Sequence, residues 1–212
     1  MRGATSLTTV VFDLGGVLID WDPRHLYRQL FDDADEMESF LAEVTTAEGN
    51  GYQDAGRPWA EAIELLVAEH PERRELIEAF HRRWPEMLAG EIPGTVAVLA
   101  DLRAAGLRLI ALSNWSAEMF PVALARFDFL AWFEGIVISG EVGVNKPDRR
   151  IFEHLTSRFE IEPESAVFVD DSPANIDAAI ALGFRAIRFT DATALRRALV
   201  RLGLLADTRA AS

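Results

Sequence analysis

The chain has 212 residues, half of them hydrophobic, which suffices for one domain of good size or for a core domain with a smaller insert. Its net charge of −13 argues against general attraction to nucleic acid or to an anionic membrane, because such binding depends on clustered lysine and arginine. The absence of cysteine excludes disulfides, thiol catalysis and thiolate zinc sites. We therefore expect small-molecule partners.

The first predicted element is a buried strand at Val10–Phe12, which ends at Asp13. Gly15 and Gly16 follow, and an apolar run that ends in an acid and two glycines is typical of a strand that delivers a carboxylate to a tight, open turn. The residues before it, Met1–Thr9, lack the apolar segment of a secretory signal, and no apolar run reaches ~18 residues. We expect a cytoplasmic protein, either a monomer or a homodimer.

From Asp20 to Gly90 the pattern predicts helices and no strand. Asp22 before Pro23 is typical of a helix start. Thr46–Gly56 contains three glycines and no apolar periodicity, which predicts a loop. The predicted helices cover residues 22–31, 33–44, 58–69 and 71–84. Residues 20–90 are thus predicted to be a helical insert in a core formed by residues 1–19 and 91–212.

Beyond Gly94 helices and strands alternate. Strands are predicted at residues 107–112, 135–138, 165–169 and 185–189, and helices at 95–105, 117–126, 148–159, 173–182 and 191–202. This alternation predicts an α/β fold of the Rossmann-like class, with a parallel sheet covered by helices on both faces. The tail, residues 206–212, is expected to fray.

Polar side chains follow several of the predicted strands, where ligands bind in open parallel sheets. Each could simply form a turn, cap a helix or be a solvated lysine. Together, however, they provide the parts needed to bind and cleave a phosphate monoester. The residues are Asp13, Ser113, Asn114, Lys146, Asp170 and Asp171.

The phosphoryl group is a dianion that repels an attacking carboxylate, so a divalent cation and a lysine must offset its charge. In this interpretation Asp13 and Asp171 hold Mg²⁺, and Lys146 supplies the second positive charge. The Ser113 hydroxyl and nearby backbone N–H groups bind the phosphoryl oxygens. Asp13 attacks in line and forms an aspartyl-phosphate that water hydrolyses. Asn175 lies one helical turn after Asp171, so its side chain is expected to support the metal or a metal-bound water.

Four motifs in order make the sequence similar to the haloacid dehalogenase-like hydrolase superfamily over most of its length. They are Val11–Leu18, Ala111–Asn114, Asn145–Pro147 and Phe168–Asn175. The resemblance implies that residues 20–90 form a cap that closes over the substrate. It implies that Asp13 is the nucleophile, Ser113 the phosphate binder, Lys146 the charge-neutralising lysine and Asp171 a metal ligand. With the residues argued above, the predicted site has these members: Asp13 and Lys146 as catalytic groups, Ser113, Asn114 and Gly16 for the substrate, Asp13, Gly15 and Asp171 for Mg²⁺, and Asp170 and Asn175 in support.

The first motif resembles most closely the branch of sugar phosphatases that act on glucose 1-phosphate and begin this motif with Asp-Leu-Gly. It departs from the superfamily pattern at Gly15. Most such phosphatases have a second Asp there, whose side chain protonates the leaving group and whose carbonyl binds Mg²⁺. Because positioned proton transfer contributes ~10²- to 10⁴-fold in rate, we predict either a slow phosphatase or a substitute acid. Asp20 and Asp22 are nearby candidates, although Asp22 suits a helix cap better.

Two other functions stay open. The superfamily includes 2-haloacid dehalogenases, which need no metal and also lack the second Asp, but which do not usually keep an acidic pair such as Asp170–Asp171. A catalytically silent phosphate-binding protein is the third interpretation. The sequence does not identify a substrate, but residues 49–52 and Arg57 would face the site if the predicted loop meets the core.

Overall fold

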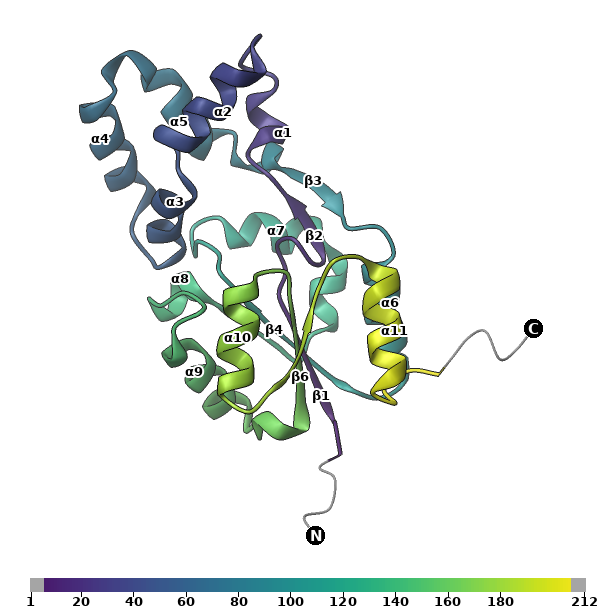
Figure 1. The fold of residues 1–212 in the computed structure, drawn as a ribbon. Coiled ribbons are helices and arrows are strands. Elements are labelled where there is room, and N and C mark those ends of the chain that lie inside the picture. Colours follow the sequence, from purple (N-terminus) through teal and green to yellow (C-terminus); the bar gives the residue numbers. More distant parts are fainter. Residues whose placement is uncertain (1–5, 207–212) are drawn as a thin grey trace.

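The computed structural model describes residues 6–206, and its centre is a five-stranded parallel sheet (Figure 1). The strand order is β5-β4-β1-β6-β7, with β1 (Thr9–Phe12), β4 (Arg108–Ser113), β5 (Gly135–Ile138), β6 (Ala166–Asp170) and β7 (Arg185–Arg188). The predicted α/β fold is therefore confirmed. Phe12, at the end of the central strand, pairs with Ala111 on one side and Val169 on the other. Asp13 consequently emerges between the ends of β4 and β6.

Helices cover both faces of this sheet, which explains why the strands read as continuous apolar runs. Val10 and Phe12 share an apolar cluster with Leu99 of α6 (Thr95–Ala104) and with α11 (Ala192–Arg201). Val11 faces the opposite cluster, built on α9 (Arg149–Phe159) and α10 (Pro173–Ala181). Figure 1 shows these two pairs of helices on opposite sides of the strands. The core also contains α7 (Phe120–Arg126), which begins three residues later than predicted, and the short helix α8 (Ser139–Val142), which was not predicted.

The insert contains the predicted helices with some changes. They are α1 (Arg24–Tyr27), α2 (Ala34–Glu43), α4 (Trp59–Glu69) and α5 (Arg74–Arg82). Asp33 caps α2, because its side chain accepts hydrogen bonds from two backbone N–H groups of the first turn. The single helix predicted over residues 71–84 is wrong only in its extent, since α5 covers residues 74–82. Short 3₁₀ turns at Pro71–Arg73 and Trp84–Met87 flank α5, and Pro85 lacks the N–H that would continue a helix.

Two further predictions for the insert are wrong. Residues 20–90 do contain strands, since β2 (Ile19–Trp21) pairs antiparallel with β3 (Leu88–Glu91) where the chain enters and leaves the insert. Such short strands give no readable alternation. The predicted loop at Thr46–Gly56 contains a helix, α3 (Ala47–Asp54), which begins where the Thr46 hydroxyl accepts from the N–H of Gly49.

The insert packs directly on the core. One apolar cluster includes Trp59 and Phe80 of the insert as well as Trp115 and Phe120 of the core. The predicted boundaries at residues 19/20 and 90/91 fall within the β2–β3 ribbon, and the division into two domains stays a prediction. Within residues 6–206, none of the helices has the length and hydropathy needed to cross a membrane. Of the tail predicted to fray, residues 207–212 lie outside the described part.

Candidate active site

Asp13 is held in a defined orientation at the end of β1. Its Oδ1 accepts hydrogen bonds from the backbone N–H of Leu14 (2.7 Å) and from the Ser113 hydroxyl (2.8 Å), and its Oδ2 lies 2.9 Å from Lys146 Nζ. The residue is only 8% exposed. Burial raises the pKa of Asp13 to about 7, Lys146 opposes this rise, and Asp170 adds to it. The site thus contains a carboxylate whose charge depends on the lysine.

Lys146 lies in the loop after α8 (Ser139–Val142), and its ammonium group is buried among oxygen atoms. Nζ contacts Asp13 Oδ2 (2.9 Å) and Asp170 Oδ2 (2.7 Å) and donates to the carbonyl of Leu112 (2.8 Å). Burial lowers the pKa of Lys146, but the two carboxylates raise it more, so that the net direction is upward. The lysine therefore stays charged and neutralises the pair of acids beside it.

Asn114 positions that lysine. Its Nδ2 donates to the carbonyl of Lys146 (3.0 Å), and its Oδ1 accepts from the N–H of Lys146 (2.8 Å). Both ends of the amide are thus bonded to one backbone segment. This contact fixes the loop, and the predicted role of Asn114 in substrate binding stays a prediction.

The acidic pair at the end of β6 has two different environments. Asp170 is fully buried and accepts from Lys146, from the N–H of Ser172 (2.9 Å) and from Asn175 Nδ2 (2.9 and 3.1 Å). Asn175 thus orients Asp170, and its expected role in supporting the metal stays a prediction. Asp171 is exposed as a residue, but partial desolvation of its carboxyl, together with repulsion from Asp170, raises its pKa.

The three aspartates form a group suited to a hard cation. Asp13, Asp170 and Asp171 each offer a carboxylate oxygen, and these oxygens lie within 4.8 Å of one another. Carboxylate oxygens are the donors that Mg²⁺ prefers, and three carboxylates here face one lysine, Lys146, which leaves negative charge to balance. Protein donors already contact both oxygens of Asp170, which is fully buried, and the choice of Asp13 and Asp171 as the metal ligands stays a prediction.

Gly16 permits the approach of Asp171. Its φ is +72°, and a Cβ at this position would lie 2.6 Å from Asp171 Oδ2. Any side chain at position 16 would therefore push the carboxylate of Asp171 away. The close approach of Asp171 thus explains why this position is a glycine. A role for Gly16 in binding the phosphate stays a prediction.

A cleft of about 350 Å³ opens beside these residues, between the core and the insert. Gly15 lines it, and a Cβ at Gly15 would meet nothing within 4 Å. The place where the superfamily carries its second Asp is thus open space. The described residues that line the cleft are Gly15, Trp21, Asn50, Asp54, Trp84, Asn114, Trp115 and Ser116.

Asp54 is the acidic group that the sequence analysis missed. It is the last residue of α3, and its Oδ2 accepts from Asn50 Nδ2 (3.0 Å). Burial raises the pKa of Asp54 to about 7, a hydrogen bond with the backbone of Ser116 opposes the rise, and the charge of Asp13 adds to it. The readable signals were Thr46 as a helix cap and Gly56 after the helix end.

Of the two substitute acids considered from the sequence, neither lines this cleft. Asp20 Oδ1 lies 3.0 Å from His25 Nε2, and its side chain is 47% exposed. The side chain of Asp22 accepts from the N–H of Arg24, the first residue of α1, although Pro23 and not Asp22 is the N-cap residue of this helix.

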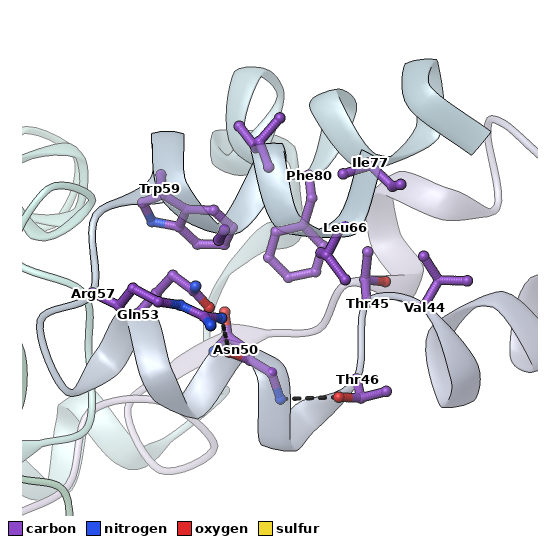
Figure 2. Close-up of a pocket in the computed structure, with 13 residues that line it drawn as sticks. Val44, Thr45, Thr46, Asn50, Gln53, Arg57, Trp59, Leu66, Ile77 and Phe80 are labelled. Atoms are coloured by element: carbon purple, nitrogen blue, oxygen red, sulfur yellow. Dashed lines mark hydrogen bonds between the residues drawn. The ribbon is translucent and has the colours of Figure 1, made fainter. Parts of the chain in front are cut away.

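A second pocket, of about 390 Å³, lies inside the insert (Figure 2). Figure 2 shows Asn50, Gln53 and Arg57 on one side of it and the rings of Trp59 and Phe80 on the other. Arg57 was expected to face the site but lines this pocket and donates to the carbonyl of Gly49 (3.3 Å). Among residues 49–52, Asn50 lines both the pocket and the cleft, whereas Tyr52 is 53% exposed.

Comparison with known proteins gives a family match over most of the chain. A model described as haloacid dehalogenase-like hydrolase matches residues 7–183. A phosphoserine phosphatase of Thermus thermophilus is 35% identical over 135 residues, which are 62% of this chain and 52% of that protein. This chain thus spans about half the length of that relative. A phosphorylated carbohydrates phosphatase of Thermotoga maritima is 26% identical over 190 residues, 85% of this chain and 84% of that one.

Among solved structures, the enzyme bt-2542 of Bacteroides thetaiotaomicron, in complex with magnesium and inorganic phosphate, has a TM-score of 0.67 and 23% identity. The superposition covers 88% of this chain and 96% of that one. At this level of identity the likeness supports the shared fold, including the parallel sheet and the helical insert.

Proposed function

The chain belongs to the haloacid dehalogenase-like hydrolase family, and on this basis we propose that it is a Mg²⁺-dependent phosphatase acting on small phosphorylated metabolites. The observation that carries the proposal is the contact of Asp13 with Lys146 and Ser113 at the edge of an aspartate cluster. A nucleophilic carboxylate, a buried cation and oxygen ligands for a metal are the groups that phosphoryl transfer requires.

Each residue has a defined task in this reaction. Bound Mg²⁺, held by Asp13, Asp171 and the carbonyl of Gly15, would offset the charge of the phosphoryl group. Lys146 opposes the rise in the pKa of Asp13 through its contact at 2.9 Å and so favours the ionised, nucleophilic form. Asp13 then attacks phosphorus, the ester P–O bond breaks, and an aspartyl-phosphate forms on Asp13.

Ser113 and Lys146 also serve the phosphoryl group. The Ser113 hydroxyl, which donates to Asp13 Oδ1, lies where it can turn to a phosphoryl oxygen when substrate binds. Lys146 is held in place by the buried carboxylate of Asp170. Water completes the cycle by hydrolysing the aspartyl-phosphate, which releases inorganic phosphate and restores Asp13.

The cleft favours an organic part rich in oxygen acceptors. Trp21, Trp84 and Trp115 supply aromatic walls. The indole N–H groups of Trp21 and Trp115 are buried and have no hydrogen-bond partner within residues 6–206, although buried donors normally find one. Hydroxyl groups of a sugar would provide these acceptors once substrate binding uncovers the two N–H groups, which are covered in this structure. We therefore place sugar phosphates, glucose 1-phosphate among them, first among candidate substrates.

One assay separates the three functions left open by the sequence. Purified protein is incubated with 4-nitrophenyl phosphate, with Mg²⁺ or with EDTA, and separately with 2-chloropropionate. We expect phosphate release that requires Mg²⁺. Metal-independent chloride release would support a dehalogenase instead, and the absence of both products would support a phosphate-binding protein.

The sugar preference needs its own measurement. We expect a higher kcat/KM for glucose 1-phosphate than for ethyl phosphate, which lacks hydroxyl acceptors. In Trp115→Phe, which removes one unpartnered indole N–H, this preference should shrink by about fivefold to tenfold, because a hydrogen bond contributes roughly 1 kcal/mol. Equal kcat/KM values for the two esters in the wild type would exclude sugar recognition while leaving the phosphatase proposal intact.

A further inference from the structure

We propose that Asp54 is the general acid and base of this enzyme, supplied by the insert in place of the side chain missing at Gly15. The inference rests on the proposed phosphatase function and assigns one further catalytic residue to it. Asp54 would give a proton to the leaving oxygen in the first half of the reaction and remove one from water in the second.

Position is the first argument. Gly15 and Asp54 line the same cleft, and of the described residues that line it Asp54 alone carries a titratable side chain. The space above Gly15 is open, since a Cβ there would meet nothing within 4 Å. A substrate whose phosphoryl group lies at Asp13 would extend its organic part into this cleft. The leaving oxygen would then lie between the core and α3.

The second argument is that α3 is fastened to the core at the end that carries Asp54 (Figure 1). The Ser139 hydroxyl, at the start of α8, donates to the carbonyl of Asp54 at 2.5 Å. One turn earlier, Asn145 Nδ2 donates to the carbonyl of Gly51 at 2.6 Å. Asn145 directly precedes Lys146, so the insert is anchored beside the catalytic lysine. These bonds fix the backbone of Asp54 relative to Asp13.

The third argument is the surroundings of the carboxyl group. Asn50 Nδ2 donates to Oδ2 at 3.0 Å, and Ser116 lines the same cleft as the carboxyl group. The hydrogen bond from Asn50 orients the side chain in a cleft that three tryptophan rings also line. Burial raises the pKa of Asp54 to about 7, which lets the group hold and lose a proton near neutral pH. An exposed carboxyl such as Asp20 lacks such surroundings.

The complete reaction balances with water as the second substrate. Asp13 forms a bond to phosphorus as the ester P–O bond breaks, and the proton of Asp54 passes to the leaving oxygen, which departs as an alcohol. Water then attacks the aspartyl-phosphate and gives a proton to the Asp54 carboxylate. The P–O bond to Asp13 breaks, inorganic phosphate leaves, and Asp54 is protonated again for the next turnover.

The test compares two esters of similar size that differ in how much they need an acid. Benzyl phosphate releases an alkoxide unless it is protonated, whereas 4-nitrophenyl phosphate releases a stabilised phenolate. In Asp54→Asn we expect kcat/KM for benzyl phosphate to fall by ~10²- to 10⁴-fold and that for 4-nitrophenyl phosphate by less than about threefold, because kcat/KM reports the step that expels the leaving group.

The second readout is the aspartyl-phosphate itself. With 4-nitrophenyl phosphate, Asp54→Asn should form it normally but hydrolyse it slowly, so that rapid quench and mass spectrometry detect its accumulation. Glu48→Gln is the matched control, because Glu48 is an exposed carboxylate on the same helix and lines neither pocket. This control should retain wild-type values for both esters.

The outcomes are distinct. An equal loss of kcat/KM for both esters in Asp54→Asn would show a structural role and overturn the proposal. Wild-type kcat/KM values for both esters, with no accumulation of the aspartyl-phosphate, would overturn it as well. A wild-type protein that hydrolyses neither ester in Mg²⁺ would refute the phosphatase function itself, and the inference with it.

Discussion

The contact between Lys146 and its two carboxylates allows a quantitative test of the site, by the substitution Lys146→Met. Methionine has a similar length but no charge, so the change leaves Asp13 and Asp170 buried without their common counter-ion. Removing one partner of a buried ion pair costs about 3–5 kcal/mol in the free energy of unfolding. In a protein of this size that loss corresponds to a fall in Tm of roughly 6–20 °C.

The loss should depend on pH in a direction that follows from Asp13. Its pKa in the folded protein is raised from the ordinary value of 3.8 to about 7 even though Lys146 lowers it, so removal of Lys146 raises it further. A raised folded-state pKa means that protonation stabilises the folded state at low pH, and that this contribution is lost as pH rises through the folded-state pKa. The variant should therefore be closer to wild type near pH 5 than near pH 8.

Urea unfolding in the presence of EDTA, at both pH values, measures the difference without compensation by a metal. Arg149→Met is the control, since it removes the same charge from an exposed pair with Glu153 and should cost about 0.5 kcal/mol or less. A Lys146→Met variant within about 1 kcal/mol of wild type near pH 8 would contradict the argument, because it would mean that the two carboxylates do not need the lysine.

Three further variants test separate parts of the site. Asp13→Asn removes the nucleophile, so the rate of phosphate release from 4-nitrophenyl phosphate should fall at least about 10³-fold. Rapid-quench mass spectrometry should detect no aspartyl-phosphate in this variant. Turnover near that of wild type would refute covalent catalysis. Gly16→Ala places a Cβ 2.6 Å from Asp171 Oδ2 and adds about 1–2 kcal/mol of backbone strain, so both the Tm and the apparent affinity for Mg²⁺ should fall. Gly106→Ala is the matched control, because Gly106 also has a positive φ but a Cβ there would meet nothing within 4 Å. This control should lower the Tm alone. Equal Mg²⁺ titrations for the two variants would contradict the role given to Gly16. Gly15→Asp, added to Asp54→Asn, restores a carboxylate to the cleft from the core side and should raise kcat/KM for benzyl phosphate at least about tenfold over the single variant; an unchanged value would show that the two positions do not reach the same leaving oxygen.

The core of the molecule is predictable from sequence because its strands are buried on both faces. Val10–Phe12 and Ala166–Val169 are wholly buried, which forces continuous apolar runs that end where the chain reaches the ligand-binding edge. Asp13 and Asp170 stand at these ends, so their convergence followed from the parallel order alone. Their contacts did not follow, since the sequence contains no sign that Lys146 bonds to both or that Asn175 turns to Asp170.

The insert was less predictable because tertiary contacts fix its local structure. Glycines at positions 49 and 51 weaken α3 and leave it without an apolar face, and the helix is held by Ser139 and Asn145 of the core instead. The strands β2 and β3 are too short for a period of two to be recognised. A helix predicted as a loop hides the direction of its side chains, and for that reason Asp54 was missed although Thr46 and Gly56 mark the two ends of the helix.

The location of Asp54 changes what the missing side chain at Gly15 means. In a loop next to the nucleophile, an acid would be in place whether or not the insert covers the site. On α3, an acid is in place only while Ser139 and Asn145 hold the helix against the core. If Asp54 is the proton donor, then the contact of α3 with Ser139 and Asn145 also completes the set of catalytic residues. Water that enters while α3 is away from the core would then meet an active site without its general base. The carboxylate that is absent at position 15 would then be unnecessary, and the open space beside Gly15 would hold the leaving group.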